Sequence, residues 1–113
     1  LEVRESVLGS DHPEIAAALN NMAALCEVHG HLDEAHTYII RALKIYQAVF
    51  GLENPKVAAS LSNLAAIYQK KNQFEEAEKT YKRGLEMALK LFGKNSPLYV
   101  KIKLNLERLQ AQI

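Results

Sequence analysis

The stretch that decides the fold runs from Pro55 to Phe92 and reads PKVAASLSNLAAIYQKKNQFEEAEKTYKRGLEMALKLF. Apolar residues recur at three- and four-residue steps on both sides of a short polar turn at residues 71–73. This spacing is typical of amphipathic α-helices. The stretch therefore predicts a helical hairpin, with a first helix at residues 55–71 and a second helix at residues 74–92.

The pattern of this hairpin returns along the chain at intervals of 42 residues. A Gly-xxx-Pro connector occurs three times in one register, at residues 9–13, 51–55 and 93–97. Three asparagines share the same spacing, namely Asn21, Asn63 and Asn105. A fixed period of this size indicates stacked structural repeats. We therefore predict an all-α solenoid of stacked antiparallel helix hairpins.

The register also divides the chain. We expect the end of a preceding repeat's second helix at residues 1–9, repeat one at 10–51 and repeat two at 52–93. Residues 94–113 are expected to form a half repeat that ends in a capping helix. Repeat one has its helices at residues 13–29 and 32–50 in this scheme.

Residues that commonly begin or end helices support these boundaries. Proline suits the first turn of a helix, and glycine suits the position after the last turn. Asn54 and Ser96 are good N-caps, whereas either His12 or Asp11 caps the first helix. Two interpretations of Asn72 stay open, a capping box with Glu75 or a stop for the preceding helix.

The last segment gives conflicting local signals. Apolar and polar residues alternate from Leu98 to Leu106, which by itself predicts a strand. The repeat register instead places Leu106 and Leu109 on Leu64 and Ile67, which predicts a helix. A single strand would have no pairing partner, so we predict a helix. Its polar residues suit a terminal cap and are Lys101, Lys103, Glu107, Arg108 and Gln110.

The composition limits the kinds of function. The chain has 113 residues, 49% of them hydrophobic, which is enough for one core. No run of about 18 apolar residues occurs, so no membrane span is predicted. The single Cys26 fits a reducing compartment, and we predict a cytoplasmic protein. The chain begins inside a repeat without an initiator methionine, which predicts a piece of a larger protein.

The charges are unevenly distributed although the net charge is only +1. Residues 1–36 hold seven acidic residues and one arginine, so residues 37–113 hold the other 13 basic and 6 acidic residues. Two explanations stay open: an asymmetric solvated surface, or a basic end that attracts an acidic partner. No basic run interleaved with aromatic residues occurs, so nucleic-acid binding is not expected.

The residues within each hairpin carry a family resemblance. The pattern Leu-xx-Met-Ala-xx-Cys-xxx-Gly-x-Leu-xx-Ala-xxx-Ile-xx-Ala covers residues 19–42, and a matching pattern covers residues 61–84. Both resemble the tetratricopeptide repeat. The 42-residue length, the Leu-Gly-x-x-His-Pro connector at 8–13 and the Leu-Asn-Asn-Met-Ala stretch at 19–23 are similar to the variant in kinesin light chains. The resemblance implies a right-handed α-solenoid that binds other proteins as a scaffold or adaptor.

Three residues depart from that family pattern. Cys26 stands where an aromatic residue is usual, Gly84 where alanine is usual, and Asn72 where glycine is usual. Cys26 suggests an underfilled first hairpin. Gly84 either costs about 1 kcal/mol relative to alanine or permits a close helix approach.

Catalytic and metal chemistry are not expected. No Ser-His-Asp arrangement, phosphate-binding glycine loop or pair of carboxylates in a cleft can be derived, so we predict neither an enzyme nor a cofactor. A cysteine and three histidines lie close in sequence and raise the question of a metal site: Cys26, His29, His31 and His36. The register places Cys26 on the core position of Tyr68, and a structural zinc site needs four converging ligands. We therefore predict no metal site.

The candidate binding residues come from the first helix of each repeat, which lines the concave face of such a solenoid. They are Asn20, Asn21, Ala24 and Glu27 in the first, Ser62, Asn63, Ala66, Gln69 and Lys70 in the second, and Lys101, Asn105 and Arg108 in the last. Ala17, Val28, Ala59 and Leu104 fall on the same face. Small residues leave room for a ligand's side chains.

The chemistry of this face favours a peptide. A carboxamide both donates and accepts hydrogen bonds, so Asn21 and Asn63 are able to hold an extended backbone. Local hydrogen bonds between adjacent repeats explain the same asparagines equally well. Arg108 and Lys70 would attract acidic side chains or a terminal carboxylate, although Lys70 is also explained as solvated surface. We predict a peptide partner, acidic in part. The alternative is self-assembly, with a homodimer through the exposed ends.

Overall fold

The computed structural model describes residues 12–113. Its elements are α2 (Pro13–Val28), α3 (Leu32–Phe50), α4 (Pro55–Lys70), α5 (Phe74–Phe92) and α6 (Pro97–Gln112). Residues 1–11 hold three of the sequence-based predictions, which are the end of a preceding helix, the Gly9 stop and the Asp11 cap. These lie outside the described residues.

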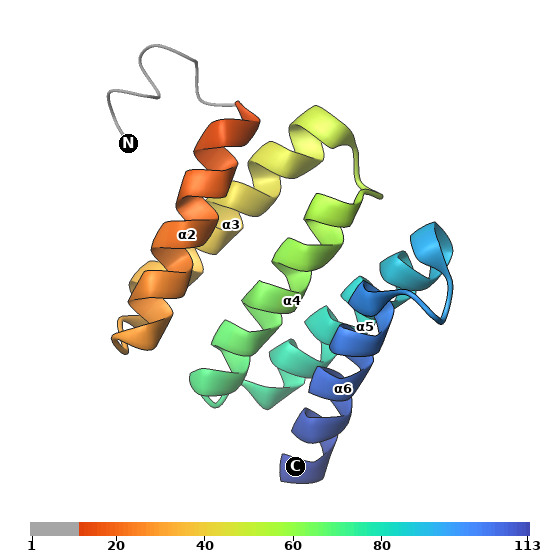
Figure 1. Ribbon diagram of the computed structural model, residues 1–113. Coiled ribbons are helices and arrows are strands. Elements are labelled where there is room, and N and C mark those ends of the chain that lie inside the picture. The colour runs from red at the N-terminus through yellow and green to blue at the C-terminus, as the bar shows by residue number, and fades with distance from the viewer. Residues whose placement is uncertain (1–11) are drawn as a thin grey trace.

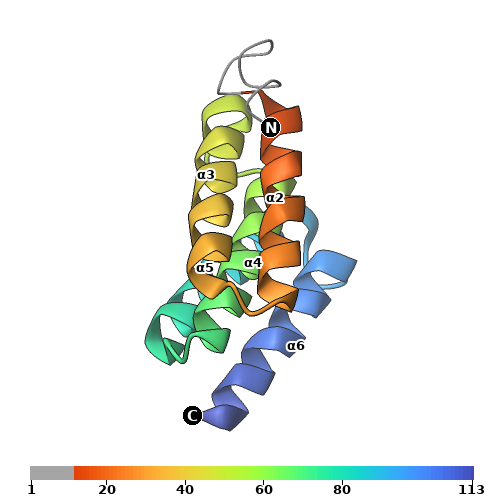
Figure 2. The same cartoon turned by 90° about the vertical axis from the view of Figure 1, so that its left-hand side faces the viewer.

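The five helices form two layers. Helices α2, α4 and α6 lie side by side in one layer, and α3 and α5 lie behind them (Figures 1 and 2). Each first helix packs most extensively on the second helix of its own hairpin, α2 on α3 and α4 on α5. Helix α3 then packs on α4, and α5 on α6, so contacts run from neighbour to neighbour. The prediction of an all-α solenoid is confirmed.

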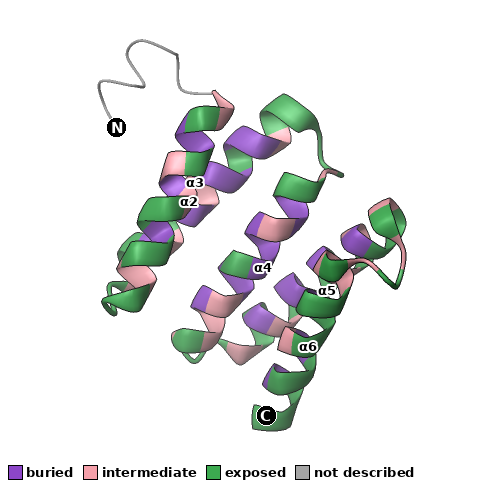
Figure 3. Cartoon of the chain, viewed as in Figure 1, coloured by how far each residue is buried: buried purple, intermediate pink, exposed green. Residues whose placement is uncertain are grey.

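The core follows the junctions between helices, and Figure 3 shows the buried residues on the facing sides. One apolar cluster joins α2, α3 and α4 through residues such as Leu19, Ile39 and Leu61, which are all 0% exposed. A second cluster joins α4, α5 and α6 and includes Tyr81 and Ile102. Buried apolar side chains therefore connect each helix of the stack to its neighbours.

Residues 97–112 are helical, as the repeat register predicts and as the local alternation does not. Ile102, Leu106 and Leu109 of α6 are buried in the second cluster. A helix brings these three residues onto one face, where they pack on the preceding hairpin. The alternation in this segment is thus coincidental.

The helix caps follow the predicted chemistry. Asn54 Oδ1 accepts a hydrogen bond from Lys56 N at 2.8 Å, and Ser96 Oγ accepts one from Tyr99 N at 3.1 Å. His12 caps α2, because its Nδ1 accepts from Glu14 N at 3.1 Å. Asn72 has a φ of +64°, so the helix-stop interpretation is correct and the capping box is wrong.

Candidate functional site

All twelve candidate residues lie on α2, α4 and α6, the layer of first helices. We call the surface that they form the first-helix face. Six of them are exposed, namely Asn21, Ala24, Asn63, Lys70, Lys101 and Arg108. Five are half-buried, namely Asn20, Glu27, Ala66, Gln69 and Asn105, and Ser62 is buried.

The three aligned asparagines keep their amides available. Asn21 and Asn63 are exposed, and Asn105 is half-buried. Within residues 12–113, none of these three side chains has a hydrogen bond to another side chain or to the backbone. Hydrogen bonds between adjacent repeats therefore do not account for these asparagines.

Other candidate residues already form ion pairs or hydrogen bonds between neighbouring first helices. Lys70 Nζ lies 3.0 Å from Glu27 Oε2, which links α4 to α2. Gln69 Nε2 donates to Gln112 Oε1, which links α4 to α6, and Tyr81 donates to Gln69 Oε1 at 3.3 Å. The positive charge of Lys70 is thus already matched, whereas Lys101 and Arg108 have no ion pair in the described part of the chain.

Burial raises the pKa of Tyr81, whose hydroxyl donates to Gln69 of this face. The carboxylate of Glu27 raises the pKa further, and the guanidinium of Arg108 opposes the rise. The tyrosine thus experiences charges from both α2 and α6.

The first-helix face is hollowed near the C-terminal end of α4. A cavity of about 310 Å³ opens there. Its lining consists of Ala66, Gln69, Lys70, Asn72, Phe74 and Gln112. Mostly polar side chains, together with Ala66 and the ring of Phe74, thus surround a space that is able to receive part of a ligand.

Two of the predicted contact residues are less accessible than expected. Ser62 is only 5% exposed, so its assignment as a surface contact is wrong. It is covered because α4 is packed between two neighbouring helix pairs. Asn20 has a buried Oδ1 without a hydrogen-bond partner. Burial raises the pKa of Tyr46, and the Asn20 side chain opposes that rise.

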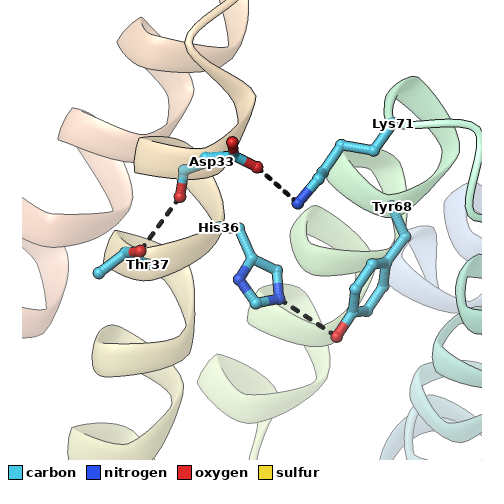
Figure 4. A network of polar contacts seen from close by, with 5 residues as sticks. All are labelled: Asp33, His36, Thr37, Tyr68 and Lys71. Carbon is cyan, nitrogen blue, oxygen red and sulfur yellow. Dashed lines mark hydrogen bonds and ion pairs between the residues drawn. The ribbon is translucent and has the colours of Figure 1, made fainter.

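The structure shows a polar network between α3 and α4 that the sequence analysis missed (Figure 4). Asp33 Oδ1 lies 2.8 Å from Lys71 Nζ, and His36 Nε2 lies 3.3 Å from the Tyr68 hydroxyl. The hydrogen bond and charge of Lys71 lower the pKa of Asp33. Burial, followed by the charge of Lys71, lowers the pKa of His36, and Asp33 opposes this effect. Neutral His36 therefore fits the junction.

The same positions make contacts at the next junction. Glu27 and Lys70 correspond, 42 residues on, to Gln69 and Gln112, which also bond to each other. The equivalents of His36 and Tyr68 are Glu78 and Gln110, and Gln110 Nε2 donates to Glu78 Oε2 at 3.3 Å. Polar pairs separated by 43 and 32 residues, recurring once per repeat, are the sequence signal that could have revealed these contacts.

The possible metal ligands are dispersed in the structure. Residues 12–113 contain no group of three or more His, Cys, Asp or Glu side chains able to hold a metal ion. His36 contacts Tyr68, and Cys26 is half-buried at the edge of the first core cluster. The prediction that Cys26 and Tyr68 occupy a core position is therefore only partly correct, because both are half-buried and pack against the edge of the first core cluster.

Sequence comparison decides the family. The sequence profile of the tetratricopeptide repeat matches residues 1–48, 30–90 and 56–112, which together span nearly the whole chain. The chain belongs to the tetratricopeptide repeat family. Members of this family are in general protein–protein interaction modules without enzymatic activity. The boundaries at residues 10–51, 52–93 and 94–113 stay a prediction.

Solved structures share the fold of this tetratricopeptide repeat chain. BtubC (BKLC) from P. vanneervenii is 29% identical with a TM-score of 0.83, over 96% of this chain and 45% of that one. Two structures of putative kinesin light chain TPR-like repeats from Podosopora anserina are 23% and 24% identical, with TM-scores of 0.82 and 0.79. Each covers 98% of this chain and 53% of its own length, so the present chain spans about half of these proteins.

The resemblance to the kinesin light chain type of repeat is thus confirmed at the level of the fold. No curated protein gives a significant match. Within residues 12–113, none of the helices is both apolar enough and long enough to cross a membrane.

Proposed function

We propose that the first-helix face holds an extended peptide segment of a partner protein. The observation that carries this proposal is the row of amides at Asn21, Asn63 and Asn105, one on each first helix, without hydrogen bonds inside the described chain. An extended backbone has unpaired N–H and C=O groups at regular intervals, and a carboxamide complements both. The row therefore suits binding of a peptide main chain.

The neighbouring side chains support a peptide rather than a flat protein surface. Ala24 and Ala66 are small and leave space beside the asparagines. The cavity of about 310 Å³ at Ala66 and Gln69 offers a place for one larger side chain.

Charge on this face favours acidic residues at the α6 end of the peptide. Lys70 is neutralised by Glu27, so it adds little attraction. Lys101 and Arg108 are exposed and lie on α6. We infer that an acidic side chain or a terminal carboxylate of the partner lies near Arg108, since guanidinium groups pair well with carboxylates.

The experiment is a peptide-array screen with this protein, followed by affinity measurements on a captured peptide. Asn63→Ala is expected to weaken binding by about two- to tenfold, because a hydrogen bond of this kind contributes roughly 0.5–1.5 kcal/mol. Asn95→Ala is the matched control, since Asn95 is exposed in the turn before α6. Equal affinities of the two variants would remove Asn63 from the site.

Self-assembly is a second candidate function, favoured by an apolar stripe on α2. Leu25 is 59% exposed and Val28 is 78% exposed. A contiguous exposed apolar stripe often marks an interaction surface. Sedimentation tests this candidate: a dimer that Leu25→Lys dissociates would support it, and a concentration-independent monomer would dismiss it.

A further inference from the structure

The polar network of Figure 4 closes one end of the contact between the first and second hairpins. Asp33 and His36 lie at the start of α3, and Tyr68 and Lys71 lie at the end of α4. Helix α2 packs most extensively on α3, and α4 on α5, so each hairpin is a packed unit. The contact of α3 with α4 therefore sets the position of one hairpin relative to the other.

The end of α4 also carries part of the first-helix face. Lys70 precedes Lys71 in the chain, and its Nζ lies 3.0 Å from Glu27 Oε2 on α2. Gln69 and Lys70 line the cavity of about 310 Å³. A movement of this turn away from α3 would thus displace residues that belong to the candidate peptide site.

The surroundings of His36 oppose a positive charge on its ring. The side chain of Lys71 is only 21% exposed, whereas that of Asp33 is 93% exposed. Solvent ions therefore screen the attraction of Asp33 more than the repulsion of Lys71. Burial and then Lys71 lower the pKa of His36, and Asp33 opposes them. In the described part of the chain, α2, which also packs on α3, supplies no charge that acts on this ring.

Protonation also changes the hydrogen bonding of the ring. A neutral imidazole has one donor and one acceptor nitrogen, whereas an imidazolium only donates. His36 Nε2 lies 3.3 Å from the Tyr68 hydroxyl, with the ring centroids 5.3 Å apart. Protonation thus adds a charge beside the ammonium of Lys71, in a contact that suits a neutral ring. At the next junction Glu78 and Ile113 take the places of His36 and Lys71, so two cations do not meet there.

We propose that His36 makes this junction an acid-sensitive hinge: its protonation loosens the last turn of α4 from α3 and weakens binding at the first-helix face. Ile39, Leu64 and Ile67 stay buried in the first core cluster, so the opening is confined to the polar end of the junction. The weakened binding rests on the proposed peptide function, whereas the loosening does not. Such a hinge holds a ligand at neutral pH and releases it more readily in acid.

Hydrogen exchange measures the loosening without any ligand. Protection factors correct for the intrinsic effect of pH on exchange, and they are compared at about pH 7.5 and about pH 5, on either side of the ordinary histidine range. The amides of residues 68–71 should lose protection about two- to fivefold in acid, as expected for an interaction between partly exposed charges.

Two variants test the cause of this loss. His36→Gln keeps a polar side chain without a titratable ring, so its protection at residues 68–71 should not change with pH. Lys71→Gln retains the imidazole but removes the neighbouring ammonium, so it should reduce the loss. An unchanged protection in the wild-type protein, or an equal loss in His36→Gln, would overturn the proposal.

Peptide affinity is the second readout. A captured peptide should bind the wild-type protein about two- to fivefold more weakly at the lower pH, for the same electrostatic reason. Titration of the peptide itself affects both proteins equally, so the comparison with His36→Gln isolates the hinge. An affinity that falls equally in both would overturn the coupling to binding. Failure to capture any peptide would instead contradict the proposed function, and hydrogen exchange would still decide whether His36 loosens the junction.

Discussion

Helices α2 and α4 hold the same place in two successive hairpins, yet their apolar residues have different surroundings. Leu64 and Ile67 of α4 are 4% and 1% exposed, while their equivalents Met22 and Leu25 of α2 are 38% and 59% exposed. Helix α3 packs on α4, and no helix in residues 12–113 packs in that way on α2. The comparison teaches that burial in this chain depends on the neighbouring repeat as well as on the residue itself.

The largest effect is expected from truncating equivalent residues in the two helices. Ile67→Ala should lower the free energy of unfolding by about 2–5 kcal/mol, because it leaves a cavity in the core. Leu25→Ala should change it by about 0.5 kcal/mol or less, since the side chain is largely exposed. Urea denaturation of both variants checks this. Comparable losses would contradict the view that the two positions differ.

An intermediate effect concerns the second helices, where Gly84 of α5 corresponds to Ala42 of α3. A Cβ at residue 84 would have its nearest contacts at 3.5 Å from Ala58 O and Leu61 Cβ and 3.6 Å from Ile102 Cδ1, which are ordinary distances. Gly84→Ala should therefore stabilise the protein by up to about 1 kcal/mol through helix propensity. The reverse change, Ala42→Gly, should destabilise it. Thermal unfolding measures both, and a destabilising Gly84→Ala would show that the close helix approach requires glycine.

The smallest expected effect is a difference in how stability depends on pH between the α3–α4 junction, which contains His36, and the α5–α6 junction. The pKa of His36 is lowered in the folded state, so the unfolded chain binds more protons as the pH falls below the ordinary histidine range. The stabilisation is complete above the unfolded pKa and is lost as the pH falls through the folded pKa. The second junction has Glu78 in place of His36. Denaturation over this pH range should show a slope that His36→Gln reduces, and an unchanged slope would exclude His36 as its source.

Most of the fold could be predicted from the sequence because the repeat register constrains it. The spacing of Gly51 and Gly93 and of the prolines that follow gives helix ends within a residue or so of those in the structure. The register also gives the correct helix for α6, although local alternation predicts a strand. Regular spacing is informative here because each unit packs in the same way on its neighbour.

The sequence was less informative about individual side chains on the first-helix face. It assigned Ser62 to the surface, but packing between neighbouring helices covers that side chain. It left Lys70 available for a ligand, but the residue pairs with Glu27 of the preceding repeat. Both outcomes depend on contacts between repeats, which a pattern within one repeat does not contain. Comparing polar pairs across successive repeats would have revealed the pairing of Lys70 with Glu27.

The most direct test of the central claim is an NMR measurement on the side-chain amides of the protein with a captured peptide. Resonances of Asn21, Asn63 and Asn105 should shift together on titration, while that of Asn95 should not. This result would show that the row of asparagines contacts the ligand. Saturating binding that leaves all three amide resonances unchanged would contradict the assignment of the first-helix face as the peptide site.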